Sequence, residues 1–260
     1  MASKDYIDYE FPLNERTRLF LRIEEVFNRI NHFFAQSHSQ EHHIVMLLLI
    51  ELTELCQRAD LKAELLMTLD YQANQFTTYL HHPLVDQNLL NTLLQEIHTV
   101  QHELINSIGI FGQDIRQNDM ITSLKKRSVL IGGPATFDIP IYHHWLNRSA
   151  EERYSYLLDL IGTFKPLYEA IRIVLRLLRS APKMITYSSN QNGYFEYTLA
   201  GQMVDLLSVR MNQSESFFPD LSANKYCATI QFMHINSESH LVKYQEQIAF
   251  KLVLYQLYER

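Results

Sequence analysis

Histidine is the residue type with the richest potential for chemistry in this chain. The sequence has 12 histidines, including adjacent pairs at 42–43, 81–82 and 143–144. His98 and His102 are spaced i, i+4, so both rings would lie on one face of a helix and could bind one metal ion. Adjacent histidines point in different directions on a helix, so the pairs are poor chelators. A histidine-based metal-dependent hydrolase is therefore an alternative hypothesis, although the sequence predicts no metal site and no cofactor.

Nucleophilic chemistry has few candidate residues. Cys56 lies in an apolar helical segment, where a thiol is normally inert, and Cys227 lies in a predicted strand with no base close in sequence. The chain lacks the glycine-rich nucleotide loops, the G-x-S-x-G nucleophile motif and the H-E-x-x-H zinc motif. The sequence therefore predicts that the protein is not an enzyme.

Basic side chains are the more informative residues, because they recur at helical spacing. Each set alone is most often a solvated helix face, but together they could line one groove for a partner's carboxylates, which arginine forks bind well. The sets are Arg18, Arg22 and Arg29; Arg172, Arg176 and Arg179; and Arg116, Lys125, Lys126 and Arg127.

Helical periodicity runs through the first two-thirds of the chain. Asn14 and Asp86 precede amphipathic repeats as capping residues, Asp60 precedes another helix, and Ser149 with Glu152 forms a capping box. Residues 41–58 are apolar on nearly every side, as in a helix buried within a bundle. We therefore expect a mainly helical domain over residues 12–180.

Short segments rich in aromatic and β-branched residues follow Pro182. Residues 184–188 and 194–199 flank Asn192-Gly193, which predicts a hairpin with a type I′ turn. Further strands are expected within 203–211, 225–235 and 241–257. Helices followed by strands indicate the α+β class, with a helical N-terminal bundle and an antiparallel β domain over 183–257. Residues 126–131 and 135–139, and also 6–10, are expected to add strands to this sheet.

Composition limits the kinds of partner. The chain has 260 residues, 47% hydrophobic residues and a net charge of −6, and this acidity argues against general nucleic-acid binding. Its longest apolar run, residues 44–50, is far shorter than the roughly 20 residues of a membrane span, so no membrane insertion is expected. The two distant cysteines and the acidic N-terminus favour the cytoplasm.

Two segments resemble the cell division protein ZapD family. The first is YEFPLNERTR at residues 9–18, continuing LFLRIE. The second is IGGPATFDIP at residues 131–140, followed by His143 and Trp145. A weaker match is RSAP at residues 179–182.

The resemblance implies a non-enzymatic, cytoplasmic homodimer located at the mid-cell division ring. Family members bind the C-terminal tail peptide of FtsZ, cross-link and bundle its protofilaments, stabilise the Z ring and reduce FtsZ GTPase activity. These properties are expectations that rest on the resemblance alone.

The resemblance also suggests which residues form the groove for the FtsZ tail. Relatives carry basic residues where this chain has Asp119, Cys227 and Gln231, so we expect a groove that is less basic on its β side. Lys125, Arg127, Arg172 and Arg176 would compensate. The expected groove residues are Arg18, Arg22, Arg116, His143 and Lys225.

Overall fold

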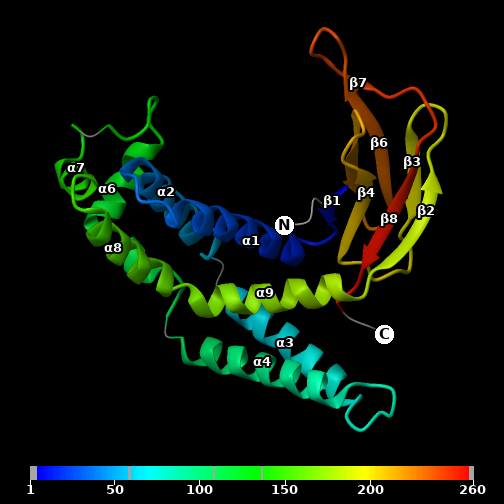
Figure 1. The fold of residues 1–260 in the computed structure, drawn as a ribbon, viewed down its shortest axis with the longest axis horizontal. Coiled ribbons are helices and arrows are strands. Elements are labelled where there is room, and N and C mark those ends of the chain that lie inside the picture. The colour runs from blue at the N-terminus through cyan, green and yellow to red at the C-terminus, as the bar shows by residue number, and fades with distance from the viewer. Residues whose placement is uncertain (1–4, 58–59, 108, 136, 258–260) are drawn as a thin grey trace. The chain divides into compact units, whose positions relative to one another are not determined.

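The computed structural model describes residues 5–57, 60–107, 109–135 and 137–257, and the chain divides into two compact units (Figure 1). The helical unit spans residues 19–175. The β unit combines the described residues before 19 with those from 176 onward. The boundaries fall inside α1, Glu15–Phe34, and α9, Lys165–Ser180, so both helices contribute to both units. The division into a mainly helical domain over 12–180 and a β domain over 183–257 stays a prediction.

The helical unit consists of α-helices of varied length joined by short connections. Among the described residues, every helix is too short or too polar to cross a bilayer. Besides parts of α1 and α9, its helices are α2, Ser39–Leu55; α3, Leu61–Thr77; α4, Gln87–Asn106; α5, Gln113–Gln117; α6, Asp119–Ser128; α7, Pro140–Leu146; and α8, Ala150–Gly162.

Polar residues cap three helices as the sequence predicts. Asn14 accepts a 2.8 Å hydrogen bond from a backbone N–H in the first turn of α1, and Asp86 accepts two at the start of α4. Ser149 and Glu152 form the predicted capping box of α8. Asp60 precedes α3 but accepts no capping bond. The caps satisfy N–H groups that lack an acceptor inside their helix.

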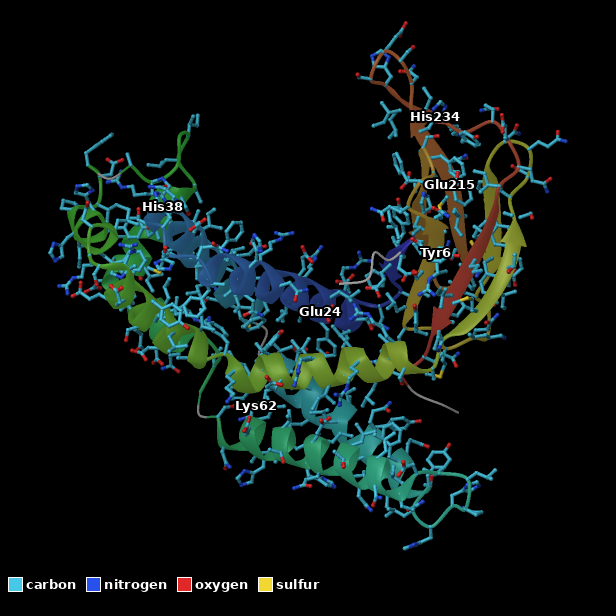
Figure 2. All side chains as sticks on the ribbon, viewed as in Figure 1. Tyr6, Glu24, His38, Lys62, Glu215 and His234 are labelled. Atoms are coloured by element: carbon cyan, nitrogen blue, oxygen red, sulfur yellow. The ribbon has the colours of Figure 1, made fainter. Side chains whose placement is uncertain are left out.

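Two further contacts that fix helix ends come from residues that sequence analysis overlooked. His38, labelled near the start of α2 in Figure 2, forms a capping box at this helix. Its Nδ1 accepts from the N–H of Gln40 at 3.2 Å, and Glu41 accepts from the N–H of His38. The Nζ of Lys62, on α3, donates to the carbonyl of Ser107 at 2.7 Å, just past α4. A basic group at a helix C-terminus satisfies carbonyls that the helix leaves unpaired.

The β unit contains two antiparallel sheets. One has the strand order β1-β4-β8-β2, and the other has the order β3-β6-β5, with β7 also paired to β6. The strands are β1, Tyr6–Pro12; β2, Lys183–Ser188; β3, Tyr194–Thr198; β4, Leu206–Asn212; β5, Phe217–Ala223; β6, Cys227–Ile235; β7, Leu241–Lys243; and β8, Ala249–Tyr255.

Buried side chains from both sheets form one hydrophobic core. Leu207 and Leu252 come from the first sheet, and Ile230 and Phe232 come from the second; all four are fully buried. Strands alternate inward and outward side chains, so this clustering places the two sheets face to face. The α+β class predicted from the sequence is confirmed.

The predicted hairpin around Asn192-Gly193 is wrong. Residues 184–188 and 194–198 are strands, but β2 pairs with β8 and β3 pairs with β6, in different sheets. A type I′ turn needs a positive φ at both central residues, and only Gly193 has one, at 65°. A Cβ on Gly193 would lie 2.5 Å from the carbonyl oxygen of Tyr244, so this glycine permits a close approach between two backbone segments of the chain.

The strands predicted at 126–131 and 135–139 are also wrong. Residues 126–128 form the last turn of α6, and two successive turns follow, closed by N–H to carbonyl bonds from Leu130 to Arg127 and from Gly133 to Leu130. Gly132 and Gly133 have φ values of 90° and 70°, a left-handed conformation that a strand does not use. Thr136 lies outside the described residues.

The strand β5 was not predicted from the sequence. Pro219 within it disfavours a strand assignment, since proline cannot donate a ladder hydrogen bond. The structure places β5 at the end of its sheet, where that donor is not required.

Candidate partner-binding surface

The residues predicted to form the groove are divided between the two units. Arg18 and Lys225 belong to the β unit, as does Arg176. The others, Arg22, Arg116, Lys125, Arg127, His143 and Arg172, belong to the helical unit.

Arg22 presents an exposed guanidinium on α1. Its neighbours Leu19 and Ile23 are buried, whereas Arg22 lies on the solvent side of the helix. Within the described ranges, no carboxylate pairs with it. Its positive charge is therefore available to an acidic ligand.

Arg18, one turn earlier on α1, is already engaged. Its Nε lies 3.3 Å from a carboxylate oxygen of Glu15, and its side chain is 34% exposed. A second nitrogen donates to the carbonyl of Pro12 at 3.3 Å, and the guanidinium carbon lies 5.7 Å from the centre of the Phe11 ring. The side chain thus also holds the junction between β1 and α1, and its replacement would disturb that junction.

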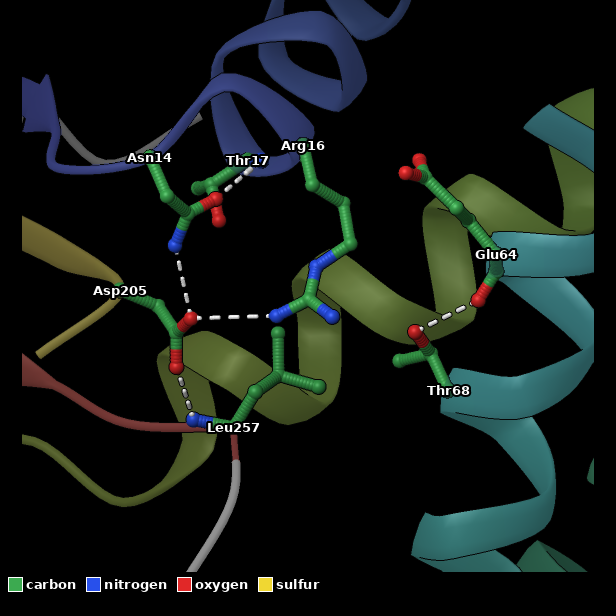
Figure 3. A network of polar contacts seen from close by, with 7 residues as sticks. All are labelled: Asn14, Arg16, Thr17, Glu64, Thr68, Asp205 and Leu257. Atoms are coloured by element: carbon green, nitrogen blue, oxygen red, sulfur yellow. Dashed lines mark hydrogen bonds and ion pairs between the residues drawn. The ribbon is translucent and has the colours of Figure 1, made fainter. Parts of the chain in front are cut away.

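The start of α1 is fixed to the β unit by Asp205, which is buried (Figure 3). Its Oδ1 accepts from Asn14 Nδ2 at 2.8 Å and from Arg16 at 3.3 Å. Its Oδ2 accepts from the backbone N–H of Leu257 at 2.8 Å. Asn14 and Arg16 lie in the family-like segment at 9–18, and in this structure they position α1.

The arginines of α9 are also used within the protein. Arg179 makes a two-pronged ion pair with Glu10 on β1, at 2.7 and 2.8 Å, within the β unit. Arg172 pairs with Glu169 at 2.6 Å and lines a largely polar cleft of about 460 Å³ beside α4. The predicted stripe on α9 is therefore not a uniform face of available cations.

Arg116 and Lys125 lie together at a cleft of about 110 Å³ in the helical unit. Ile50, Ile115 and Ile121 supply its apolar wall. Arg116 donates to the carbonyl of Phe111 at 2.6 Å, and Lys125 forms an ion pair with Glu54. The cleft therefore combines an apolar wall with two cations, each already engaged within the helical unit, and with the carboxylate of Glu54.

Cys56 is close to this cleft but is not a reactive thiol. Burial raises its pKa to about 12, and the nearby charge of Arg116 lowers it only in part. The thiolate, which is the nucleophilic form, is therefore scarce at neutral pH.

A wider cleft of about 470 Å³ lies beside α7. His144 lines it together with Trp145 and Tyr156, whereas the predicted residue His143 is exposed and does not line it. Sequence analysis missed Tyr156 because its position on the helix α8 gives no indication that it faces α7.

Lys225 lies in the turn between β5 and β6 and is exposed. Its Nζ lies 4.8 Å from the centre of the Tyr226 ring, a cation–π geometry. Gln231, where the family resemblance suggests a basic residue, donates to the carbonyls of Asn192 and Gly193 at 3.0 and 3.2 Å. The amide of Gln231 therefore stabilises the β unit. Lys225, six residues earlier in the sequence, is an exposed cation.

The histidines do not assemble a metal site in the part of the chain that the structure describes. His98 and His102 are exposed and hydrogen bond to Gln101 and Asn106 on the same helix. The side-chain arrangement therefore gives no support to the hydrolase hypothesis.

His42 and His43 are packing residues of the helical unit. His42 is fully buried and accepts a 3.2 Å hydrogen bond from Arg153 through Nδ1, so its proton resides on Nε2 and faces the carbonyl of Gln36 at 2.9 Å. His43 contacts the hydroxyl of Tyr142 at 2.5 Å. Burial is the main cause that lowers the pKa of both histidines.

Comparisons with known proteins all point to one family. The family model described as "ZapD: Cell division protein" matches residues 21–231. The chain is similar to proteins called "Cell division protein ZapD" from several bacteria. One from Aromatoleum aromaticum is 35% identical over 233 residues, which covers 90% of this chain and 91% of the relative.

Two further relatives show similar coverage. That from Azoarcus sp. is 35% identical over 246 residues, 95% of this chain and 98% of its own length. That from Dechloromonas aromatica is 36% identical over 226 residues, 87% of this chain and 89% of its own length. The match along almost the whole chain shows that this protein belongs to the ZapD family of cell division proteins.

Proposed function

We propose that this cell division protein binds the C-terminal tail of FtsZ, cross-links and bundles FtsZ protofilaments, and thereby stabilises the Z ring in the cytoplasm at mid-cell. Membership of the ZapD family supports the role in division. The observation that carries the tail-binding proposal is the exposed guanidinium of Arg22, which has no carboxylate partner within the described residues. Bundling is also proposed to reduce FtsZ GTPase activity.

The proposed ligand is a peptide with carboxylates and apolar side chains. Arg22 would bind one carboxylate, and the cleft at Arg116 and Lys125 would receive an apolar side chain beside a second. Lys125 would have to share its charge between the ligand and Glu54. Charge-assisted hydrogen bonds of this kind contribute about 1.5–3 kcal/mol each. His143 in the helical unit, and Arg18 and Lys225 in the β unit, are each proposed as further contact residues for the tail.

Cross-linking follows if the protein is a homodimer. A dimer carries two tail sites, so binding one protofilament raises the effective concentration of the second site near a neighbouring protofilament. A modest affinity for each tail then suffices to bundle filaments that display many tails.

Calorimetric titration with the isolated tail peptide tests the site. Arg22→Glu removes an exposed cation, so we expect the melting temperature to stay nearly unchanged and the affinity for the peptide to fall at least tenfold, which needs only about 1.4 kcal/mol. Arg29→Glu is the matched control, since Arg29 is an exposed arginine of the same helix paired with Glu25. Equal affinities for both variants and the unmodified protein would remove Arg22 from the site.

Added salt provides a second test of the same site. Exposed charge pairs are screened by salt, so the affinity of the unmodified protein should fall as ionic strength rises. The Arg22→Glu variant should show a weaker salt dependence, since it has one charge pair fewer.

A further inference from the structure

Most edge strands of the β unit are protected against pairing with another chain. Backbone groups of an edge strand that point away from the sheet have no partner strand, so an extended peptide can pair with them. Charged side chains, prolines and short strands are common protections. β1 carries Asp8, Glu10 and Pro12, Pro219 interrupts β5, and β7 has only three residues.

The edge of β3 is covered by groups of its own chain. Tyr194 donates its N–H to Oδ1 of Asn190 at 2.9 Å, and its carbonyl accepts from the N–H of Asn190 at 2.8 Å. The carbonyl of Thr198 accepts from Nε2 of Gln202 at 3.0 Å. An added strand would have to displace these contacts.

The remaining edge strand, β2, has neither kind of protection. Its sequence KMITYS contains no proline and no acidic residue. Among the described strands, β2 lies at the end of its sheet and pairs with β8 alone. Its outer edge is therefore the one most open to an added strand.

The register of β2 and β8 shows which backbone groups point away from the sheet. The N–H of Ser189 donates to the carbonyl of Ile248 at 2.9 Å, and this pair continues the register of the two strands. Antiparallel strands alternate between residue pairs that are hydrogen bonded and pairs that are not. Every second residue of β2 therefore turns its N–H and carbonyl away from β8. We call the outward backbone groups of these exposed residues, Met184, Thr186 and Ser188, the β2 edge.

A group of aromatic rings lies beside the β2 edge. β2 and β3 are neighbours in the β unit (Figure 1), and the ring centre of Tyr187 lies 4.9 Å from that of Phe195 and 6.0 Å from that of Tyr197. The three rings pack against the core shared by the two sheets but are only half-buried. Every second side chain of an added strand would face these rings, so apolar side chains at those positions would cover them.

The charge around the β2 edge favours an acidic partner. Lys183 is exposed at the start of β2, and Lys251 is exposed on β8 opposite Thr186. Neither lysine forms an ion pair within the described chain. Neither β2 nor β8 contains an acidic residue.

We propose that the β2 edge binds an extended segment of a partner protein as an added strand. In this segment apolar side chains alternate with polar ones, and a carboxylate lies beside Lys183. Backbone hydrogen bonds to the β2 edge supply affinity, and the half-buried rings select the apolar side chains. A second copy of this chain fits less well, because its own β2 would add another lysine and no carboxylate. The proposal is independent of FtsZ binding, since none of its residues belongs to the proposed tail site.

Fluorescence anisotropy with a labelled synthetic peptide tests the proposal. The probe alternates valine with threonine and carries an aspartate at each end. Thr186→Pro removes an outward N–H but no hydrogen bond to β8, so the melting temperature should change little and the affinity for the probe should fall at least tenfold. Thr186→Val is the matched control, because it keeps the N–H, and it should bind the probe like the unmodified protein.

Changes in the probe provide a test that needs no variant of the protein. One peptide is N-methylated at its valines and another at its threonines, so each lacks the amide donors along one of its two edges. Only one of these edges faces β2 in an added strand, so one peptide should lose at least tenfold in affinity and the other should lose less. A probe with lysines in place of the aspartates should bind more weakly, because Lys183 would then face a like charge.

Amide hydrogen exchange measured by NMR locates the bound probe. In the free protein, the N–H groups of the β2 edge face water and should exchange fast. Those of Ile185 and Tyr187 face β8 and should exchange slowly. A saturating amount of probe should slow the exchange at the β2 edge at least tenfold.

Four results would overturn the proposal. The first two are that the unmodified protein does not bind the probe, or that Thr186→Pro and Thr186→Val bind it equally. The third is that the amides of the β2 edge are protected in the free protein and lose this protection on dilution, which would assign the edge to self-association. The fourth is that Arg22→Glu loses affinity for the probe, which would place the probe at the proposed tail site. Unchanged affinity in Arg22→Glu, together with a loss in Thr186→Pro, would support a separate site at the β2 edge.

Discussion

Replacing Asp205 with alanine would remove the carboxylate that holds the start of α1 in the β unit. In the folded chain this carboxylate accepts hydrogen bonds from Asn14, Arg16 and the backbone of Leu257, at 2.8, 3.3 and 2.8 Å. The side chains of Asp205 and Arg16 are only 11% and 20% exposed. Water therefore cannot fully replace the lost acceptor.

The expected cost follows from these contacts. A hydrogen bond to a charged group contributes about 1.5–3 kcal/mol, and the replacement removes a mostly buried carboxylate that accepts three such bonds. We expect Asp205→Ala to lower the free energy of unfolding by about 3–5 kcal/mol. Asp205→Asn keeps an oxygen acceptor but loses the charge, so it should cost about half as much.

Urea unfolding followed by far-UV circular dichroism measures this cost. Asp8→Ala is the matched control, since Asp8 makes a two-pronged ion pair with Arg210 on the more exposed surface of the same sheet, at 2.6 and 2.8 Å. Exposed pairs contribute about 1 kcal/mol or less. If both alanine variants lose the same small amount, the assignment of Asp205 as the anchor of α1 is refuted.

Two further changes test the helical unit. Gly112→Ala should lower its free energy of unfolding by about 2–4 kcal/mol, measured by thermal melting, because φ is 75° and the new Cβ would lie 2.8 Å from both Phe164 and Thr53. Acidification should also destabilise the helical unit. Burial lowers the pKa values of His42 and His43, so near the ordinary histidine pKa of about 6.5 the unfolded chain binds more protons than the folded chain. The urea midpoint should therefore decrease as the pH is lowered from 7.5 to 5.5, and it should decrease less steeply in a His43→Gln variant.

Local patterns predicted the helices better than the sheets. Caps such as Asn14 and Ser149 act within a few residues, so the sequence reveals them directly. The Asn192-Gly193 pair has the local composition of a hairpin turn. The flanking strands β2 and β3 nevertheless pair with β8 and β6, which lie far along the chain. Pairing over such distances leaves no local pattern, which also explains why β5 was missed.

In the candidate site, too, local features were predicted from the sequence and long-range contacts were not. Exposure of Arg22 follows from its place beside the apolar stripe of α1, so helical periodicity predicted it. The roles of Arg16 and Arg179 depend on Asp205 and Glu10, which are 189 and 169 residues away in sequence. A single sequence shows an arginine at each position but not whether a distant carboxylate has already engaged it.

Co-sedimentation with polymerised FtsZ tests the central proposal most directly. Full-length FtsZ and FtsZ without its C-terminal tail are polymerised separately, and each is mixed with this protein at physiological salt. We expect the protein to pellet with full-length polymers and to bundle them, and to stay in the supernatant with the tail-less polymers. Equal pelleting and bundling with both forms of FtsZ would contradict tail binding as the basis of cross-linking.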